Sequence, residues 1–302
     1  MKLGLGTAQF GLSYGISNQR GRVPADEVTS ILGLAAKHGI EVIDTAAAYG
    51  DSETVLGATL ANEAPFRIVT KTSASKHAAS AVAGQQLEEN LRDSLRRLRQ
   101  PGIYGYLLHD PRQLFAAGAD ERVAGLQQLK QKGLVEKIGV SVYTAAEIDR
   151  VLELFMPDIV QLPVSIFDQR LVSSGYLAKL KSLGVEIHAR SVFLQGLVLM
   201  PLESMPAHFQ GVATQLEKFV QFVEKAGMTR LDAALAFIAQ IEQVDVALVG
   251  VSGHDELEKI IFSVKQNKDH GLKIDNAAQW AIGCDEIVNP ALWPKASAGT
   301  GA

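Results

Sequence analysis

Four polar residues stand at the ends of predicted strands, or just beyond one, where a parallel sheet would gather them on one face. They are Asp44, Tyr49, Lys71 and His109. Tyr49 follows Asp44 by five residues, on the loop that leaves that strand. Taken singly, each has a structural interpretation: a turn carboxylate, a rim tyrosine, a solvated ammonium and a hydrogen-bonding imidazole. Their joint placement on successive strands favours a catalytic set.

These four residue types suit proton transfer to a carbonyl oxygen. A tyrosine has an ordinary pKa of about 10, too high for efficient proton transfer near neutrality. We expect the Lys71 ammonium to lower the pKa of Tyr49, and Asp44 to hold Lys71 charged in a partly dry site. His109 would orient the carbonyl group. Such a set protonates the oxygen while a hydride reaches the carbon.

The elements that must position these residues alternate along the chain. Eight short apolar runs predict strands at Lys2–Thr7, Glu41–Thr45, Arg67–Lys71, Ile103–His109, Ile138–Val142, Ile159–Leu162, Val185–Arg190 and Val246–Gly250. Between them, apolar residues recur at helical spacing, as in Leu87, Leu91, Leu95 and Leu98. Eight such units without a linker favour a closed (β/α)8 TIM barrel of class α/β over an open sheet with exposed edges.

We expect a single domain over 1–302, with its core at about 2–266 and a C-terminal tail at 267–302. Residues 191–227 exceed the length of one crossover and predict an extended loop plus an extra helix. In the tail, Asp275–Ile287 predicts a helix, and the stretch from Ser297 to Gly301 predicts a flexible end.

Composition excludes several function classes. The chain has 302 residues, a formal charge of −4 and scattered Lys and Arg, which provides no basic patch for nucleic acid. Its single cysteine, Cys284, excludes an internal disulfide, and no histidine pair at helical spacing with a carboxylate predicts a metal site. The N-terminus lacks the apolar run of a signal peptide, and no segment is long enough to span a bilayer. We therefore expect a cytoplasmic protein, and its oligomeric state stays open.

One segment carries a recognisable signature. Asp44-Thr45-Ala46-Ala47-Ala48-Tyr49-Gly50, followed by Ser52-Glu53 and Leu56-Gly57, resembles the Asp-Thr-Ala-x-x-Tyr-Gly signature of the aldo-keto reductases. The resemblance continues through Val69–Lys71, Leu107–Pro111, Gly133–Ser141 and Val160-Gln161 to Val249–Ser252. It covers roughly Leu3 to Val264, in the same order.

The resemblance implies an NAD(P)H-dependent reductase of aldehydes or ketones, with NADP(H) favoured over NAD(H). It implies Tyr49 as general acid, Lys71 as its neighbouring cation, Asp44 as the partner of Lys71 and His109 as substrate orienter. The implied cofactor-binding residues are Gly6, Thr7, Ser141, Gln161, Arg190, Ser191, Leu194, Gly196, Gly250 and Ser252. Phe10 and Tyr14 are candidates for the substrate pocket.

The sequence departs from the family pattern at three positions. Val142 stands where an asparagine usually follows the serine of the fifth strand, and Arg190 stands where an aromatic ring usually stacks on the nicotinamide. A guanidinium plane can also stack on a ring. Gly253 replaces the cation that usually reads the 2′-phosphate, for which His254, Lys259 or Lys265 could substitute. Ile187–Gly196 resembles a bacterial subgroup found with surface-polysaccharide genes, which points to a sugar-derived substrate.

Two other functions remain open on the sequence alone. The three departures fit a barrel that binds the cofactor as a sensor or scaffold with vestigial catalysis. The second function is that of a lyase or isomerase in which Lys71 forms a Schiff base with the substrate. The neighbouring Asp44 argues against this function, because a nucleophilic lysine must be neutral.

Overall fold

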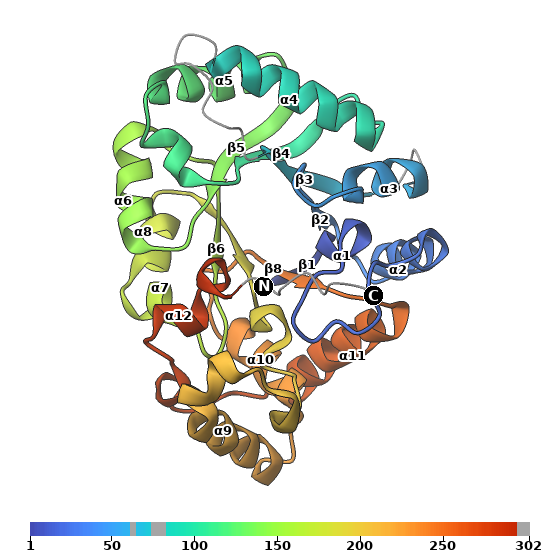
Figure 1. The fold of residues 1–302 in the computed structure, drawn as a ribbon, viewed down its shortest axis with the longest axis vertical. Coiled ribbons are helices and arrows are strands. Elements are labelled where there is room, and N and C mark those ends of the chain that lie inside the picture. Colours follow the sequence, from blue (N-terminus) through green and yellow to red (C-terminus); the bar gives the residue numbers. More distant parts are fainter. Residues whose placement is uncertain (61–64, 74–82, 295–302) are drawn as a thin grey trace, which may run out of the picture.

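A closed barrel of parallel strands forms the centre of the molecule (Figure 1). The structure is a computed structural model, and it describes residues 1–60, 65–73 and 83–294. Across these residues eight strands pair in sequence order, and the last pairs with the first. They are β1 (Lys2–Gly6), β2 (Val42–Asp44), β3 (Arg67–Lys71), β4 (Ile103–Leu108), β5 (Val135–Ser141), β6 (Ile159–Pro163), β7 (Glu186–Arg190) and β8 (Val246–Gly250). All eight predicted strands are confirmed.

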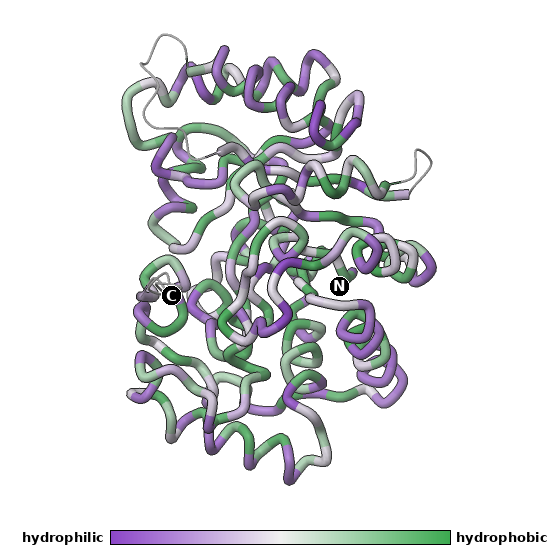
Figure 2. The backbone as a smooth tube through the Cα atoms, turned by 45° about the vertical axis from the view of Figure 1, so that its right-hand side comes forward, coloured by the Kyte–Doolittle hydropathy of each residue, from purple (hydrophilic) through white to green (hydrophobic). Residues whose placement is uncertain are grey.

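The strands are buried on both faces, as a parallel barrel requires. One apolar cluster fills the barrel interior and includes Val42, Val69, Ile159 and Leu248. A larger cluster lies between the outer faces of the strands and the helices. Figure 2 shows the outer helices alternating between hydrophilic and hydrophobic residues, which is the pattern of a helix packed on one side.

Helices surround the barrel (Figure 1). They are α1 (Ala8–Gly11), α2 (Ala25–Lys37), α3 (Ser52–Thr59), α4 (Ala83–Leu98), α5 (Ala119–Gln131), α6 (Ala145–Leu154), α7 (Arg170–Ser173), α8 (Tyr176–Ser182), α9 (Ala213–Lys225), α10 (Arg230–Ala239), α11 (His254–His270) and α12 (Asp285–Val288). The predicted stripe on α4 is buried at Leu87, Leu91, Leu95 and Leu98. Within the described ranges, no helix combines the length and the apolar character that a membrane crossing needs.

The long β7–β8 connection contains three 3₁₀ turns, at Leu194–Gly196, Leu202–Ser204 and Ala207–Val212, followed by α9. The predicted extended loop with an extra helix is therefore confirmed.

The prediction of one helix over Asp275–Ile287 is wrong. A 3₁₀ turn at Ala277–Trp280 and the short α12 occupy this part of the chain. Asn276 has a left-handed φ of 52°, and the ring of Trp280 packs on Phe219 of α9. Docking of the tail on α9 thus overrides local helical propensity. The predicted flexible stretch from Ser297 to Gly301 lies outside the described residues.

Candidate active site

A cavity of about 670 Å³ opens at the carboxyl ends of the strands. This volume is in the range of small-molecule and cofactor sites. Of the predicted catalytic residues, Asp44, Tyr49 and His109 line it. Lys71 is completely buried, and its ammonium reaches Tyr49 from within the barrel. The four predicted catalytic residues are thus brought together in one place.

Lys71 is held by three oxygen atoms. Its Nζ donates to Asp44 Oδ1 and Oδ2 at 2.8 and 2.7 Å and to the Thr45 carbonyl at 2.9 Å. Gln161 Nε2 also donates to Asp44 Oδ1, at 2.7 Å. The buried carboxylate is therefore saturated, and it fixes the position of the ammonium without leaving an unpaired charge.

Tyr49 stands between the ammonium and the imidazole. Lys71 Nζ lies 3.5 Å from the Tyr49 Oη, and the His109 ring meets the Tyr49 ring edge-on with centroids 5.7 Å apart. Gly50 has a left-handed φ of 55°, which turns the chain directly after Tyr49. Gly11 of α1 lies against the Tyr49 carbonyl so closely that a Cβ at residue 11 would overlap it. A close backbone contact therefore sets the position of the tyrosine.

The electrostatics of Tyr49 differ from the expectation. Burial raises the pKa of the Tyr49 phenol above its usual range, Asp44 raises it further, and Arg190 acts in the opposite direction. Burial of the phenol is the main cause of the difference, and the neighbouring Asp44 carboxylate adds to it. Tyr49 is therefore a protonated acid throughout the neutral range.

His109 is neutral in the same range. Burial and the nearby charge of Lys71 lower the pKa of His109 to about 4, and Arg190 acts in the same direction. A neutral imidazole carries one N–H, which can donate to a carbonyl oxygen.

A second layer of hydrogen bonds supports the strand ends. Ser52 Oγ, completely buried at the start of α3, donates to the Thr7 carbonyl at 2.8 Å. Glu53 accepts from Thr70 Oγ1 at 2.6 Å and from Arg97 Nε at 2.7 Å. The Ser-Glu pair of the sequence signature thus ties α3 to β1, β3 and α4.

Most of the predicted cofactor-binding residues line the cavity. These are Gly6, Thr7, Ser141, Gln161, Arg190, Ser191, Gly196, Gly250 and Ser252, together with the substrate-pocket candidate Tyr14. Leu194 and Phe10 do not line it. Both are completely buried in the main hydrophobic core. Leu194 anchors its loop, and α1 turns the ring of Phe10 away from the cavity, so the placement of Phe10 in the substrate pocket is corrected.

The loop after β7 is strained where it borders the cavity. Ser191, Leu194 and Gln195 all have left-handed φ values, of 58°, 47° and 52°. Such conformations are uncommon for residues other than glycine and cluster at functional sites. The Ile16 amide donates to the Gln195 carbonyl at 3.1 Å, so the loop after β1 meets the loop after β7 at the cavity.

Arg190 lies on a residue that the sequence analysis missed. Its guanidinium carbon is 4.0 Å from the centroid of the Tyr143 ring, and its Nη2 donates to the Val142 carbonyl at 3.1 Å. Tyr143 lines the cavity. The available signal was an aromatic residue directly after Val142, the position already marked as unusual.

At the end of the cavity near α11, a cation comes from the loop between α1 and α2, which the sequence did not indicate. Arg20 lines it and pairs with Asp255 through Nη1–Oδ1 at 2.7 Å and Nη2–Oδ2 at 3.0 Å. The Arg20 guanidinium occupies the space into which a side chain at Gly253 would extend. Lys259 also lines the cavity, whereas His254 and Lys265 do not.

Backbone donors at this end are partly occupied. The Ser252 amide donates to Glu256 Oε2 at 2.8 Å and the His254 amide to Glu27 Oε1 at 2.6 Å. A phosphate at the N-terminus of α11 would therefore have to compete with two carboxylates.

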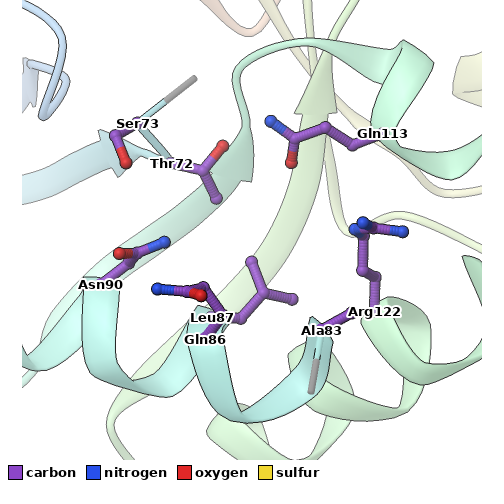
Figure 3. A pocket seen from close by; sticks show the side chains of 8 residues that line it. All are labelled: Thr72, Ser73, Ala83, Gln86, Leu87, Asn90, Gln113 and Arg122. Carbon is purple, nitrogen blue, oxygen red and sulfur yellow. The ribbon is translucent and has the colours of Figure 1, made fainter. Parts of the chain in front are cut away.

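Two other cavities lack comparable chemistry. One of about 10 Å³, between Thr72, Asn90 and Arg122, has room for about one water molecule (Figure 3). Another of about 680 Å³ lies between α2 and α11, bordered by apolar residues such as Leu34, Ile261 and Phe262. Neither contains any of the four catalytic candidates.

Comparison with known proteins agrees with this site. The sequence profile of the Aldo/keto reductase family matches residues 2–275. This chain belongs to the aldo/keto reductase family. The family comprises nicotinamide-dependent oxidoreductases built on the (β/α)8 barrel.

Individual aldo/keto reductases are similar at modest identity. The aldo-keto reductase AKR2E4 of Bombyx mori is 30% identical over 183 residues, which cover 56% of this chain and 57% of that protein. The aflatoxin B1 aldehyde reductase member 4 of Homo sapiens is 23% identical over 311 residues, covering 89% and 93%. The match spans about half the length of several curated relatives.

Solved structures of aldo/keto reductases share the fold. The holo form of AKR11C1 from Bacillus halodurans has a TM-score of 0.71 at 19% identity, covering 91% of this chain and 94% of that one. The glycerol dehydrogenase AKR11B4 from Gluconobacter oxydans has a TM-score of 0.64 at 23% identity, with the same coverage.

Proposed function

We propose that this chain reduces an aldehyde or ketone to an alcohol with a nicotinamide cofactor, and that Tyr49 is the proton donor. The observation that carries the proposal is the Tyr49 Oη at the cavity, 3.5 Å from a buried Lys71 ammonium that Asp44 holds in place. A cavity with a fixed acid and a neutral imidazole suits a carbonyl substrate.

The cavity fits a nicotinamide cofactor. Ser141 and Gln161, paired on the adjacent strands β5 and β6, offer a hydroxyl and an amide to the carboxamide group. On the opposite side, Gly6 at the end of β1 has no side chain, so a ligand can approach the backbone there, whereas the Gln9 side chain lies beside Gly250. When bound, the nicotinamide supplies the hydride.

The protein's own residues would handle the proton and the oxygen. Tyr49 donates its phenolic proton to the carbonyl oxygen as negative charge develops there. His109, neutral near pH 7, donates a hydrogen bond to the same oxygen and aligns it. Lys71 then stabilises the Tyr49 phenolate that remains, because its Nζ lies beside the Oη.

For the cofactor we propose NADP(H) over NAD(H). Arg20 takes the space of the missing side chain at Gly253, and Lys259 lines the same end. An arginine fork matches phosphate oxygens in geometry and charge. Arg20 would exchange Asp255 for the 2′-phosphate.

For the substrate we propose a small, hydroxylated carbonyl compound such as a sugar derivative. Gln19 and Gln195 give the cavity side-chain amides that can hydrogen-bond to hydroxyl groups, whereas the Asn18 amide is used within its own loop.

The test is fluorescence titration with NADPH and NADH, followed by turnover of nitrobenzaldehydes and a panel of aldoses and ketoses. We expect tight NADPH binding and turnover that falls about 10²- to 10⁴-fold in Tyr49→Phe. Absence of binding to both cofactors would refute the proposal, as would unchanged turnover in the variant.

The departures at Val142, Arg190 and Gly253 support a second candidate, a cofactor-binding sensor or scaffold. Tight cofactor binding without turnover across the whole panel would favour this candidate. Efficient turnover of any one substrate would exclude it.

A further inference from the structure

The charges around the reacting atoms do not cancel. Lys71 and Asp44 neutralise each other through a pair of short contacts. His109 is neutral, since its pKa lies at about 4, and Tyr49 is a protonated phenol. Among the described residues, Arg190 lines this part of the cavity without a carboxylate partner. The reacting end of the cavity therefore carries a net charge of about +1.

Arg190 is held in place by neutral groups. Its Nη2 donates to the Val142 carbonyl at 3.1 Å, its Nη1 donates to Ser191 Oγ at 3.3 Å, and its plane lies over the Tyr143 ring. These contacts fix the guanidinium and leave its charge uncompensated. A half-buried cation is costly without a partner, so a charge kept there calls for a functional reason.

The nicotinamide ring must come within reach of this charge. Hydride transfer requires the donor carbon to lie roughly 3–3.5 Å from the substrate carbon, whose oxygen lies on Tyr49. Ser141, Gln161 and Arg190 lie on three adjacent strands, β5, β6 and β7, and all three line the cavity. The electric field of Arg190 reaches across the cavity. The guanidinium acts to lower the pKa of Tyr49, against the effect of burial, and it also lowers the pKa of His109, in the same direction as burial.

The two redox states of the cofactor differ in charge at this ring. The oxidised nicotinamide is a cation, whereas the dihydronicotinamide is neutral. A fixed positive charge nearby raises the free energy of the oxidised ring and leaves the reduced ring almost unaffected.

We propose that Arg190 makes the site discriminate between the redox states of the cofactor: it weakens binding of the oxidised form and spares the reduced form. The inference rests on the proposed function. In the reduction, two electrons and a proton leave the dihydronicotinamide as hydride, and Tyr49 supplies the second proton to the oxygen. Weaker binding of the oxidised cofactor speeds its departure, and it also makes the bound oxidised cofactor a stronger hydride acceptor.

The experiment is equilibrium binding of NADPH and NADP⁺ to the wild-type protein, to Arg190→Gln and to Arg190→Lys. In the wild type we expect the Kd for NADP⁺ to exceed that for NADPH by roughly tenfold or more, since one nearby charge at intermediate dielectric is sufficient for this. The ratio should fall about tenfold in Arg190→Gln and be retained in Arg190→Lys, because lysine keeps the charge and loses the planar stack.

Each outcome decides the inference. A wild-type ratio at or below one overturns it without any variant, so the test survives a variant that does not fold. An unchanged ratio in Arg190→Gln also overturns it, as does an Arg190→Lys protein that behaves like Arg190→Gln. Absence of binding to both forms in the wild type would instead refute the proposed function. Binding and turnover with an unaffected ratio would refute this inference alone.

Discussion

Two polar clusters lie on the strands of the same barrel, and they differ in what surrounds them. The carboxyl-end cluster consists of Asp44, Tyr49, Lys71, His109 and Arg190. The amino-end cluster consists of Tyr104, Lys137, Glu186 and His188. In the amino-end cluster Glu186 accepts from Tyr104 Oη at 2.7 Å, lies 2.7 Å from His188 Nε2 and pairs with Lys137. None of these four described residues lines the active-site cavity.

The difference separates polar residues that stabilise a fold from polar residues for which we propose a chemical role. At the amino end, a single carboxylate is surrounded by donors and does not line the cavity at the carboxyl ends of the strands. At the carboxyl end, the saturated ion pair of Asp44 and Lys71 lies directly beneath a cavity, next to a phenol, an imidazole and the charge of Arg190. Burial and composition are similar in the two clusters. Access for a ligand and an uncompensated charge distinguish them.

The largest effect should follow from breaking the ion pair at the carboxyl end. Lys71→Met leaves the buried Asp44 carboxylate without its cation, so we expect the free energy of unfolding to fall by about 3–5 kcal/mol. Turnover should fall about 10²- to 10⁴-fold. The double variant Asp44→Asn with Lys71→Met removes both charges and should regain most of the stability, but none of the turnover. Chemical denaturation and steady-state kinetics measure both, and turnover in the double variant would contradict the assigned roles.

A smaller effect, on stability alone, should follow at the amino end. Glu186→Gln removes the shared acceptor of Tyr104, His188 and Lys137, and we expect about 1–3 kcal/mol of destabilisation. Cofactor Kd should stay within about twofold, because the cluster does not reach the cavity. Glu153→Gln is the matched control. It breaks an exposed pair with Arg150 and should change stability by less than about 0.5 kcal/mol. A large loss of cofactor affinity in Glu186→Gln would show that the two clusters are coupled.

Much of this comparison could be predicted from the sequence. Short apolar runs between segments of helical spacing predicted all eight strands, and the predicted strand ends brought Asp44, Lys71 and His109 to one face of the barrel. The failures lie where distant contacts decide the structure. Trp280 docks on Phe219 and breaks the predicted tail helix, and α1 turns Phe10 into the core. The pKa of Tyr49 was misjudged because burial, which raises it most, and the neighbouring Asp44 carboxylate depend on the folded structure.

Arg20 illustrates what sequence patterns could not supply. It lies 233 residues before Gly253 in the chain, on a loop whose path the sequence does not define. Only the folded structure shows that its guanidinium fills the space beside Gly253. Tyr143 is a similar case, since its contact with Arg190 joins the ends of β5 and β7 across β6.

A more modest effect should follow from changing the cation at the end of the cavity near α11. Arg20→Ala should weaken NADPH binding by about tenfold or more and change NADH binding little, because only NADPH carries the 2′-phosphate. Asp255→Asn should strengthen NADPH binding, since it frees Arg20. Arg22→Ala is the control: Arg22 lies two residues away, pairs with Asp51 and does not line the cavity. If Arg20→Ala and Arg22→Ala behaved alike under fluorescence titration, the NADP(H) preference would need another origin.

The most gradual effects should separate the two clusters by pH. His109 has a pKa of about 4 in the folded protein against about 6.5 when unfolded, so the unfolded chain takes up the proton first. Stability should therefore decline as pH falls from about 6.5 to about 4. Burial raises the pKa of Glu186, but hydrogen bonds from His188, Lys137 and Tyr104 outweigh it and lower that pKa to about 2.

Glu186 is thus ionised in the fold under conditions where the unfolded carboxyl, with a pKa near 4.5, is already protonated. Its contribution is complete above that value and is lost as pH falls toward about 2. In each window the free energy of unfolding changes by at most about 1.4 kcal/mol per pH unit, which is the value for the uptake of one proton. His109→Gln should flatten only the upper window of a denaturation series between pH 7 and 3, and Glu186→Gln only the lower one. If either variant removed the pH dependence of stability in both windows, the two clusters would titrate as one unit and would be electrostatically coupled across the barrel.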